Sequence, residues 1–240
     1  MSVQKIFKRH EIKYMLTYEQ YEKLKKLMKN HMQLDKYGKN LISNLYFDTS
    51  DFLLIRRSIE KPCYKEKLRV RGYATVNHDS NVFIELKKKY KGIVYKRRIV
   101  APHDQALAYL MQNKALSDDT QITHELDYFK EFYHDLAPRV YLSYEREAFF
   151  GLIDSDFRMT FDQNILARDY DVDLTLGRYG SKVVDDGIIL MEVKTSVGLP
   201  KWLLDFFAKN HIYKTSFSKY GTAYKNFIIA KMHGGTNNVA

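Results

Sequence analysis

Apolar and polar side chains alternate along several short segments of the chain, and this period of two predicts β-strands. The predicted strands are residues 7–16, 41–50, 63–73, 81–90, 92–100, 139–151, 157–168 and 188–196. Apolar residues spaced three and four apart predict helices at 17–32, 103–113, 123–136, 201–211 and 218–233, with a short helical turn at 51–60. Thr17 and Gln20 form a predicted capping box, Pro138 ends one helix, and Pro200 opens another.

The strands are spread along the chain, and the Lys91-Gly92 pair predicts a tight hairpin between two of them. We therefore expect a mostly antiparallel α+β fold, with helices around a sheet or barrel. No internal repeat or linker separates the segments, so residues 1–240 are interpreted as a single domain. Residues 233–240 are small and polar, and we expect a frayed tail there.

Charged side chains keep to one face of the predicted strands. In 63–73, cations occupy every second position from Lys65 to Arg71, while Leu68 and Val70 point the opposite way. The charged or polar positions that share a face within each strand are Arg9, Glu11 and Lys13; Lys65, Lys67, Arg69 and Arg71; Glu85, Lys87 and Lys89; Tyr144 and Arg146; Arg158, Thr160 and Asp162; and Glu192 and Lys194.

Two arrangements explain this pattern. The simpler one is a sheet with one face in water, which is common among antiparallel folds. The alternative is a sheet that closes on itself with the charged face inside, covered by helices on the apolar outer face. Clustered cations in such a lumen repel one another and lose hydration unless an anion binds there. A few carboxylates among the cations would then suggest a divalent metal that bridges protein and phosphate.

The overall charge favours an anionic partner. Lys and Arg number 39 against 29 Asp and Glu, a net charge of +10 over 240 residues. Nucleic acid, an anionic membrane and phosphorylated small molecules all remain possible partners. Specific nucleic-acid binding is the weaker option, because it usually relies on surface cations with exposed aromatic side chains. Phosphate binding by a Walker loop is excluded, since Gly38, Gly72 and Gly92 belong to no such motif.

The remaining composition gives only broad limits. Cys63 is the single cysteine, so no intrachain disulfide forms, and we expect a cytoplasmic protein. No apolar run reaches the length of a transmembrane helix or a signal peptide. The histidines show no zinc-binding spacing, so a histidine zinc site is not expected from the sequence.

Eight motifs in chain order resemble the VTC domain, a family of the CYTH-like triphosphate tunnel metalloenzymes. They are FKRHEIKYML, SNLYFDT, KLRVRGY, FIELKKK, YEREAFFG, FRMTFD, MEVKTS and FSKYG, between about Phe7 and Tyr224. The resemblance implies a closed antiparallel β-barrel, a triphosphate tunnel, with helices packed around the outside. It also implies a basic lumen that binds triphosphate with Mn²⁺ or Mg²⁺. Eukaryotic members of the family polymerise polyphosphate from ATP.

The resemblance assigns roles to particular residues. The implied catalytic phosphate ligands are Lys13, Arg69, Arg71, Lys87, Arg146, Arg158 and Lys219. The implied additional substrate-binding residues are Tyr144, Lys194 and Ser218. Glu192 is the implied metal ligand, with Glu11 and Glu85 as further candidates, and Lys65 and Lys67 are placed at the tunnel mouth.

Two departures from the family patterns affect the functional interpretation. Arg9 replaces the first Glu of the Glu-x-Glu-x-Lys motif that opens the hydrolase branch, which favours the polymerase branch. Ser216 stands where the polymerase pattern has a lysine, and Lys214 is the candidate substitute if its segment is extended.

We therefore expect an ATP-dependent polyphosphate polymerase, a phosphotransferase that releases ADP. A metal-dependent tri- or polyphosphatase and a non-catalytic binder of polyphosphate or nucleotide are the alternatives. The expected partners are ATP, triphosphate and polyphosphate, and the family makes a membrane-embedded partner protein plausible. The sequence does not define the acceptor, the chain length or the oligomeric state.

Overall fold

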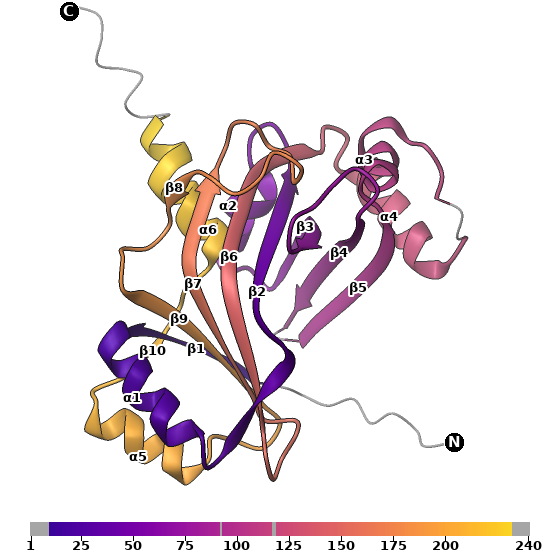
Figure 1. Cartoon of the computed structure of the whole chain (residues 1–240). Coiled ribbons are helices and arrows are strands. Elements are labelled where there is room, and N and C mark those ends of the chain that lie inside the picture. Colours follow the sequence, from indigo (N-terminus) through magenta and orange to yellow (C-terminus); the bar gives the residue numbers. More distant parts are fainter. Residues whose placement is uncertain (1–9, 92, 117–118, 232–240) are drawn as a thin grey trace, which may run out of the picture. The chain divides into compact units, whose positions relative to one another are not determined.

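The computed structural model of the chain describes residues 10–91, 93–116 and 119–231 (Figure 1). The start of the predicted core at residues 7–9 and the predicted frayed tail at 233–240 lie outside this range. The elements in chain order are β1 (His10–Thr17), α1 (Tyr18–Met28), β2 (Met32–Asp48), α2 (Leu53–Ile59), β3 (Tyr64–Tyr73), β4 (Asn81–Tyr90), β5 (Ile93–Pro102), α3 (His103–Gln112), α4 (Gln121–Phe132), β6 (Ala137–Gly151), β7 (Arg158–Arg168), β8 (Ser181–Lys182), β9 (Ile188–Thr195), α5 (Lys201–Lys209), β10 (Lys214–Thr215), α6 (Lys219–Ala223) and η1, a π-helix (Tyr224–Ile229).

The strands form a 10-stranded sheet in the order β10-β1-β9-β7-β6-β2-β3-β4-β5, with β8 beside β7. The prediction of a closed barrel is wrong, because within the described residues no ladder joins the two ends of this order. Closure requires a continuous ladder between the end strands. At one end β10 has only two residues and pairs with β1, and at the other β5 pairs with β4. The chain forms two compact units, described separately below.

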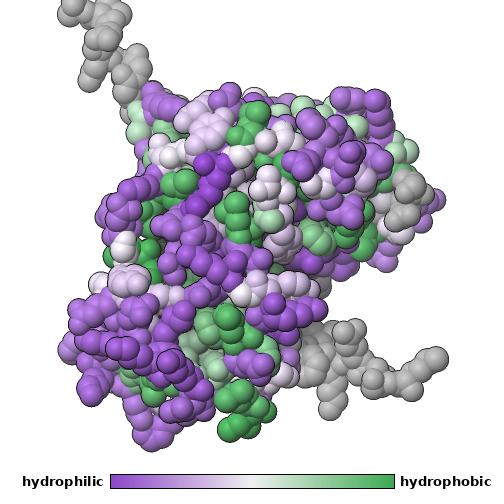
Figure 2. All heavy atoms as spheres, in the orientation of Figure 1, coloured by the Kyte–Doolittle hydropathy of each residue, from purple (hydrophilic) through white to green (hydrophobic). Residues whose placement is uncertain are grey.

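The first unit consists of the described residues within Met1–Asn40, Tyr144–Asn164 and Val184–Phe217. Its core lies on the apolar face of β1, β7 and β9, where α1 and α5 contribute further side chains. The Tyr14 ring on β1 packs against Phe207 of α5, with ring centroids 4.4 Å apart. The predicted capping box at the start of α1 is present. Figure 2 shows a largely hydrophilic surface over α1, as expected for a helix that buries one face only.

The second unit consists of the described residues within Leu41–Ser143, Ile165–Val183 and Ser218–Ala240. Alternate residues of two strands are fully buried in its core, to which α3 and α4 contribute further side chains. They are Leu68 and Val70 on β3 and Val82, Ile84 and Leu86 on β4. The hairpin between β4 and β5 is confirmed, since Tyr90 pairs with Ile93 and Lys91 has a φ of 45°. Gly92, the second residue of the predicted turn, lies outside the described residues.

Several element boundaries differ from the sequence prediction. The second strand begins at Met32, well before the predicted start at residue 41, and lies between β6 and β3 in the sheet order. Pro138 lies in the first residues of β6 and does not end α4, which stops at Phe132. The final helix is divided into α6 and the π-helix η1. Among the described residues, no helix combines the length and the apolar character that a membrane crossing requires.

Neighbouring residues on β4 provide a test of the two-faced strand. Leu86 is fully buried in the core, whereas Lys87 points to the exposed face. We expect Leu86→Ala to lower the free energy of unfolding by about 2–5 kcal/mol through loss of apolar burial and cavity formation. Lys87→Ala should change it by about 0.5 kcal/mol or less. Urea denaturation measures both, and equal losses would show that the two faces are wrongly assigned.

Candidate functional site

A group of charged side chains in the second unit lines one face of three adjacent strands, β3, β4 and β5. The antiparallel register places Arg69 opposite Glu85, and Glu85 opposite Arg98. Two residues further along each strand, on the same face, Lys67, Lys87 and Lys96 form a second row. We call this surface the β3–β5 cationic face. It comprises Lys65, Lys67, Arg69, Arg71, Glu85, Lys87, Lys89, Lys96 and Arg98. Because side chains alternate along strands, the apolar neighbours point into the core on the opposite side.

Glu85 is the acidic residue at the centre of this face, and its side chain is only 1% exposed. Its Oε2 accepts from Arg69, with Nε at 2.8 Å and Nη2 at 2.7 Å, while Arg71 Nε lies 3.7 Å away. Its Oε1 accepts from Arg98 Nε at 2.9 Å and from Lys96 Nζ at 2.6 Å. Both carboxylate oxygens are therefore engaged by cations, and a metal at Glu85 would have to displace them.

Charge and burial compete in setting the pKa values on this face. Burial alone would raise the pKa of Glu85, but Arg69 and Arg71 hold it well below its ordinary value. Burial lowers the pKa of Lys96 to about 8, although Glu85 opposes the shift. Burial would raise the pKa of Tyr46, yet Arg69 and Lys67 outweigh it and lower that pKa to about 8.

The two arginines of β3 are held by polar contacts from neighbouring elements. Arg71 Nε donates to Asn44 Oδ1 on β2 at 3.0 Å. Arg69 Nη1 donates to the Tyr46 hydroxyl at 3.1 Å. Tyr46 in turn stacks on Tyr220 of α6, with ring centroids 4.6 Å apart. These contacts fix the guanidinium groups in place, so that less conformational entropy is lost when a ligand binds.

Two predicted residues at the start of α6 lie in the same unit. Ser218 Oγ accepts from Lys67 Nζ at 3.2 Å and from Gly221 N at 3.2 Å, and so caps α6. Lys219, the first residue of that helix, is buried. Lys65 donates to the backbone oxygen of Ser58 at 3.1 Å, and burial together with Lys89 lowers its pKa.

A second group of charged residues lies in the first unit. Arg146 on β6 binds Asp162 through a fork, with Nε–Oδ1 at 2.5 Å and Nη2–Oδ2 at 2.7 Å. The same Nη2 donates to Glu192 Oε2 at 3.1 Å, and Lys13 Nζ lies 3.4 Å from Glu192 Oε1 and 3.8 Å from Glu11. Burial opposes the charge of Arg146, but Asp162 and Glu192 raise its pKa above the ordinary value. We call Glu11, Lys13, Arg146, Asp162 and Glu192 the Glu192 cluster.

The other predicted residues of the first unit flank this cluster. Arg158 and Lys194 pair across β7 and β9, and Glu11 pairs with Lys194 on the other side. Tyr144 is buried, and Arg146 lies over its ring at 5.2 Å from the centroid. The structure therefore gathers Lys13, Arg146, Arg158, Glu192 and Lys194 on adjoining strands.

The residues around Glu192 fit a hard divalent cation. Glu192 contacts its cations at 3.1 and 3.4 Å, whereas Asp162 is engaged by Arg146 at 2.5 and 2.7 Å. Thr160 pairs with Glu192 in the ladder, and its buried Oγ1 has no hydrogen-bond partner among the described residues. A carboxylate and a hydroxyl on one strand pair are oxygen donors of the kind that Mg²⁺ and Mn²⁺ prefer.

Sequence reasoning missed some residues at both places. Lys96 and Arg98 were not selected, although their alternation along β5 is visible in YKRRIV. Asp162 lay on the charged face in the sequence pattern but was given no role. The suggested role of Lys214 is not supported, because β10 pairs Lys214 with Tyr14 and thus places it on the face opposite Lys13.

The central position of Glu85 predicts a measurable stability effect. We expect Glu85→Gln to lower the free energy of unfolding at pH 7 by about 3 kcal/mol, because four cations lose their shared partner. A depressed carboxyl pKa stabilises the fold above the ordinary value of 4.5, and this contribution is lost as pH falls below it. The difference between wild type and variant should therefore shrink on acidification below pH 4.5.

Glu125→Gln is the control for this variant. Glu125 accepts from Arg97 at 3.1 Å on the opposite, α4-covered face of the same hairpin. Because this pair is more exposed, its loss should cost about 1 kcal/mol or less. Urea denaturation across pH measures both variants, and equal losses at pH 7 would contradict a central role for Glu85.

Two solved structures share the fold. A candidate adenylate cyclase from Bacillus halodurans is 14% identical, with 90% of this chain and 96% of that chain covered and a TM-score of 0.55. A candidate adenylyl cyclase from Hippeastrum, described as having a dominant triphosphatase activity, is 16% identical, with 90% and 94% covered and a TM-score of 0.55. At these identities the likeness shows the fold alone. No curated protein matches the chain.

The family assignment comes from the sequence itself. The profile of the VTC domain matches residues 8–228, which is most of the chain. This range includes both the β3–β5 cationic face and the Glu192 cluster, and it confirms the resemblance seen in the motifs. The chain therefore belongs to the VTC domain family.

Proposed function

We propose that this protein is a phosphotransferase that binds triphosphate and polyphosphate and passes the γ-phosphoryl group of ATP to a polyphosphate end. The observation that carries the proposal is the β3–β5 cationic face, where Arg69, Lys96 and Arg98 converge on one carboxylate. Membership of the VTC domain family supports the same substrate class.

The charge balance of this face favours a multiply charged anion. Glu85 neutralises part of the positive charge, but the lysine row of Lys67, Lys87 and Lys96 lies directly beside it. The Arg98 side chain is 40% exposed and that of Lys96 42%, so both are accessible to a ligand. Guanidinium groups bind phosphate oxygens with two donors at once, and lysines add point charge. A polyphosphate presents several such oxygens in a row.

The proposed transfer needs no covalent intermediate on the protein. A terminal oxygen of the polyphosphate bonds to the γ-phosphorus of ATP, the bond from that phosphorus to the bridging oxygen breaks, and ADP leaves. Catalysis of such a step consists mainly of holding the phosphates in position and stabilising their charge. Arg69 and Arg71 suit this role because Tyr46 and Asn44 already fix their side chains.

We further propose that the Glu192 cluster holds Mn²⁺ or Mg²⁺. Glu192 is the proposed ligand, with the hydroxyl of Thr160 beside it, and Asp162 keeps Arg146 oriented. A divalent cation, when bound, supplies charge stabilisation for phosphate oxygens. Lys13 donates to the backbone oxygen of Phe217 at 3.0 Å, which holds its ammonium group beside Glu192.

Hydrolysis is the second candidate function. The Hippeastrum protein, which shares this fold, is described as having a dominant triphosphatase activity. Water in place of the polyphosphate end would give free phosphate from the same phosphate-binding residues. The two functions differ in the acceptor, so the reaction products distinguish them.

Arg98 and its neighbour Arg97 allow a controlled test of phosphate binding. The two side chains have similar exposure, 40% and 37%, and each binds one glutamate, but they point to opposite faces of β5. We expect Arg98→Ala to weaken tripolyphosphate binding by about tenfold or more, through the loss of charge-assisted hydrogen bonds. Arg97→Ala should leave the Kd within about twofold. Isothermal titration calorimetry gives both values, and equal effects would contradict binding at the β3–β5 cationic face.

The products formed from ATP test the reaction. Purified protein with ATP and Mn²⁺ should give long polyphosphate chains on a gel, together with ADP. Glu192→Gln should remove most of the metal-dependent rate while tripolyphosphate binding changes less, because its proposed role is to hold the metal. Free phosphate without chains would favour the hydrolase. Tight tripolyphosphate binding with neither product would contradict both enzymatic functions.

A further inference from the structure

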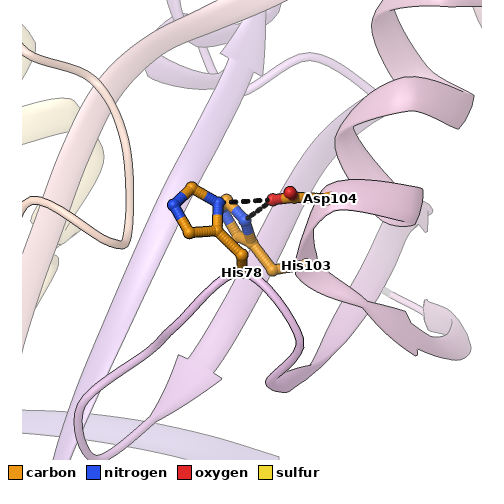
Figure 3. A group of neighbouring side chains, drawn as sticks. All are labelled: His78, His103 and Asp104. Atoms are coloured by element: carbon orange, nitrogen blue, oxygen red, sulfur yellow. Dashed lines mark hydrogen bonds and ion pairs between the residues drawn. The ribbon is translucent and has the colours of Figure 1, made fainter.

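A third group of titratable side chains lies in the second unit, away from the positions that form the β3–β5 cationic face. His78 is in the loop between β3 and β4, and His103 and Asp104 begin α3. Figure 3 shows both imidazole rings directed at the Asp104 carboxylate. Asp104 Oδ1 lies 3.0 Å from His78 Nδ1 and 2.9 Å from His103 Nδ1. Within the described residues, this is the one group of three or more His, Cys, Asp or Glu side chains with all ligand atoms within 4.8 Å.

We propose that this group binds a first-row transition metal ion of the Zn²⁺ class. The proposed ligands are the Nδ1 atoms of His78 and His103 and a carboxylate oxygen of Asp104. Ligands about 2.0–2.1 Å from a tetrahedral zinc lie about 3.3 Å apart. The observed separations of 2.9 and 3.0 Å require only a small outward movement to reach that spacing.

The surroundings of His103 Nε2 favour a metal ion on its Nδ1. His103 is almost fully buried, and its Nε2 has no hydrogen-bond partner among the described residues. The carboxylate of Asp173 lies 3.7 Å from that Nε2. With a metal on Nδ1, the proton of a neutral imidazole sits on Nε2 and faces Asp173, the usual pairing of metal-binding histidines with a carboxylate. Without a metal, a neutral His103 that donates from Nδ1 would have no proton on Nε2. Its Nε2 lone pair would then face the Asp173 carboxylate.

The backbone holds the three ligands together. His103 N donates to Ser80 O at 2.9 Å, and Asp104 N donates to His78 O at 3.2 Å. These bonds tie the β3–β4 loop to the first turn of α3. The two imidazole rings are inclined by 72° with centroids 6.2 Å apart, so they do not stack. His78 and Asp104 are 72% and 61% exposed, which leaves the ion access from solvent and room for water as a further ligand.

This proposal is independent of the proposed phosphoryl transfer. Imidazole nitrogens favour zinc and its neighbours, whereas the oxygen donors around Glu192 favour Mg²⁺ or Mn²⁺. The competing interpretation is a purely structural cluster, in which Asp104 accepts from both histidines and holds the loop without any ion. The two interpretations make different predictions about zinc affinity.

The test is a zinc titration of the full chain after chelator treatment. Zn²⁺ competes with a chromophoric chelator, and excess Mg²⁺ is present so that oxygen-rich sites do not contribute. We expect one Zn²⁺ to bind per chain, and His78→Ala to weaken this binding at least tenfold. His124→Ala is the matched control, because His124 is 69% exposed, close to the 72% of His78, and likewise pairs with a single aspartate, Asp119, at 2.6 Å. It should leave the zinc affinity unchanged.

A second measurement does not depend on the folding of any variant. Zn²⁺ should raise the Tm of the wild-type chain, because an ion that binds only the folded state stabilises it. Asp173→Asn should weaken zinc binding about tenfold through the loss of the carboxylate facing His103. Absence of zinc binding by the wild type would overturn the proposal. Equal zinc affinities for the wild type, His78→Ala and His124→Ala would overturn it as well.

Discussion

The β3–β5 cationic face depends on the ion-pair network around Glu85. Antiparallel pairing fixes Arg69, Glu85 and Arg98 in one row, so the cations of β3 and β5 meet across a shared carboxylate. The adjoining row already aligns the like charges of Lys67, Lys87 and Lys96 on adjacent strands, which destabilises a sheet, and without Glu85 the arginine row would add uncompensated charge beside it. The network therefore allows a cationic surface and a regular ladder to coexist, while the apolar face of the same strands packs against α3 and α4.

The alternation of side chains was sufficient to predict these faces. Leu68 and Ile84 point to the core and Arg69 and Glu85 away from it, as a period of two requires. The same rule placed Glu192 and Lys194 correctly on the charged side of β9. Closure of the sheet was not predictable in this way, because it depends on whether two end strands distant in sequence form a ladder. The two-residue β10 provides no such ladder.

Residues brought together by the fold were harder to find. Lys96 and Arg98 join Glu85 through the register of the β4–β5 hairpin, which the predicted Lys91-Gly92 turn already implies, so counting back from that turn would have found them. His78 and His103 are separated by a whole hairpin, so no spacing rule connects them. For the histidines the informative signal is a contact between positions far apart in the chain. Sequence patterns with short periods do not contain that signal.

Tyr46 and Lys96 on this surface would also couple anion binding to proton binding. Tyr46 and Lys96 both have pKa values near 8, set by the cations and the burial around them. A bound polyanion would offset the positive field on Tyr46 and stabilise the ammonium of Lys96, and both effects raise the pKa. Thermodynamic linkage then requires that the anion draw protons onto the protein near this pH, and that its affinity fall as the solution becomes more alkaline. The surface would thus take up protons when the anion binds and release them when it leaves.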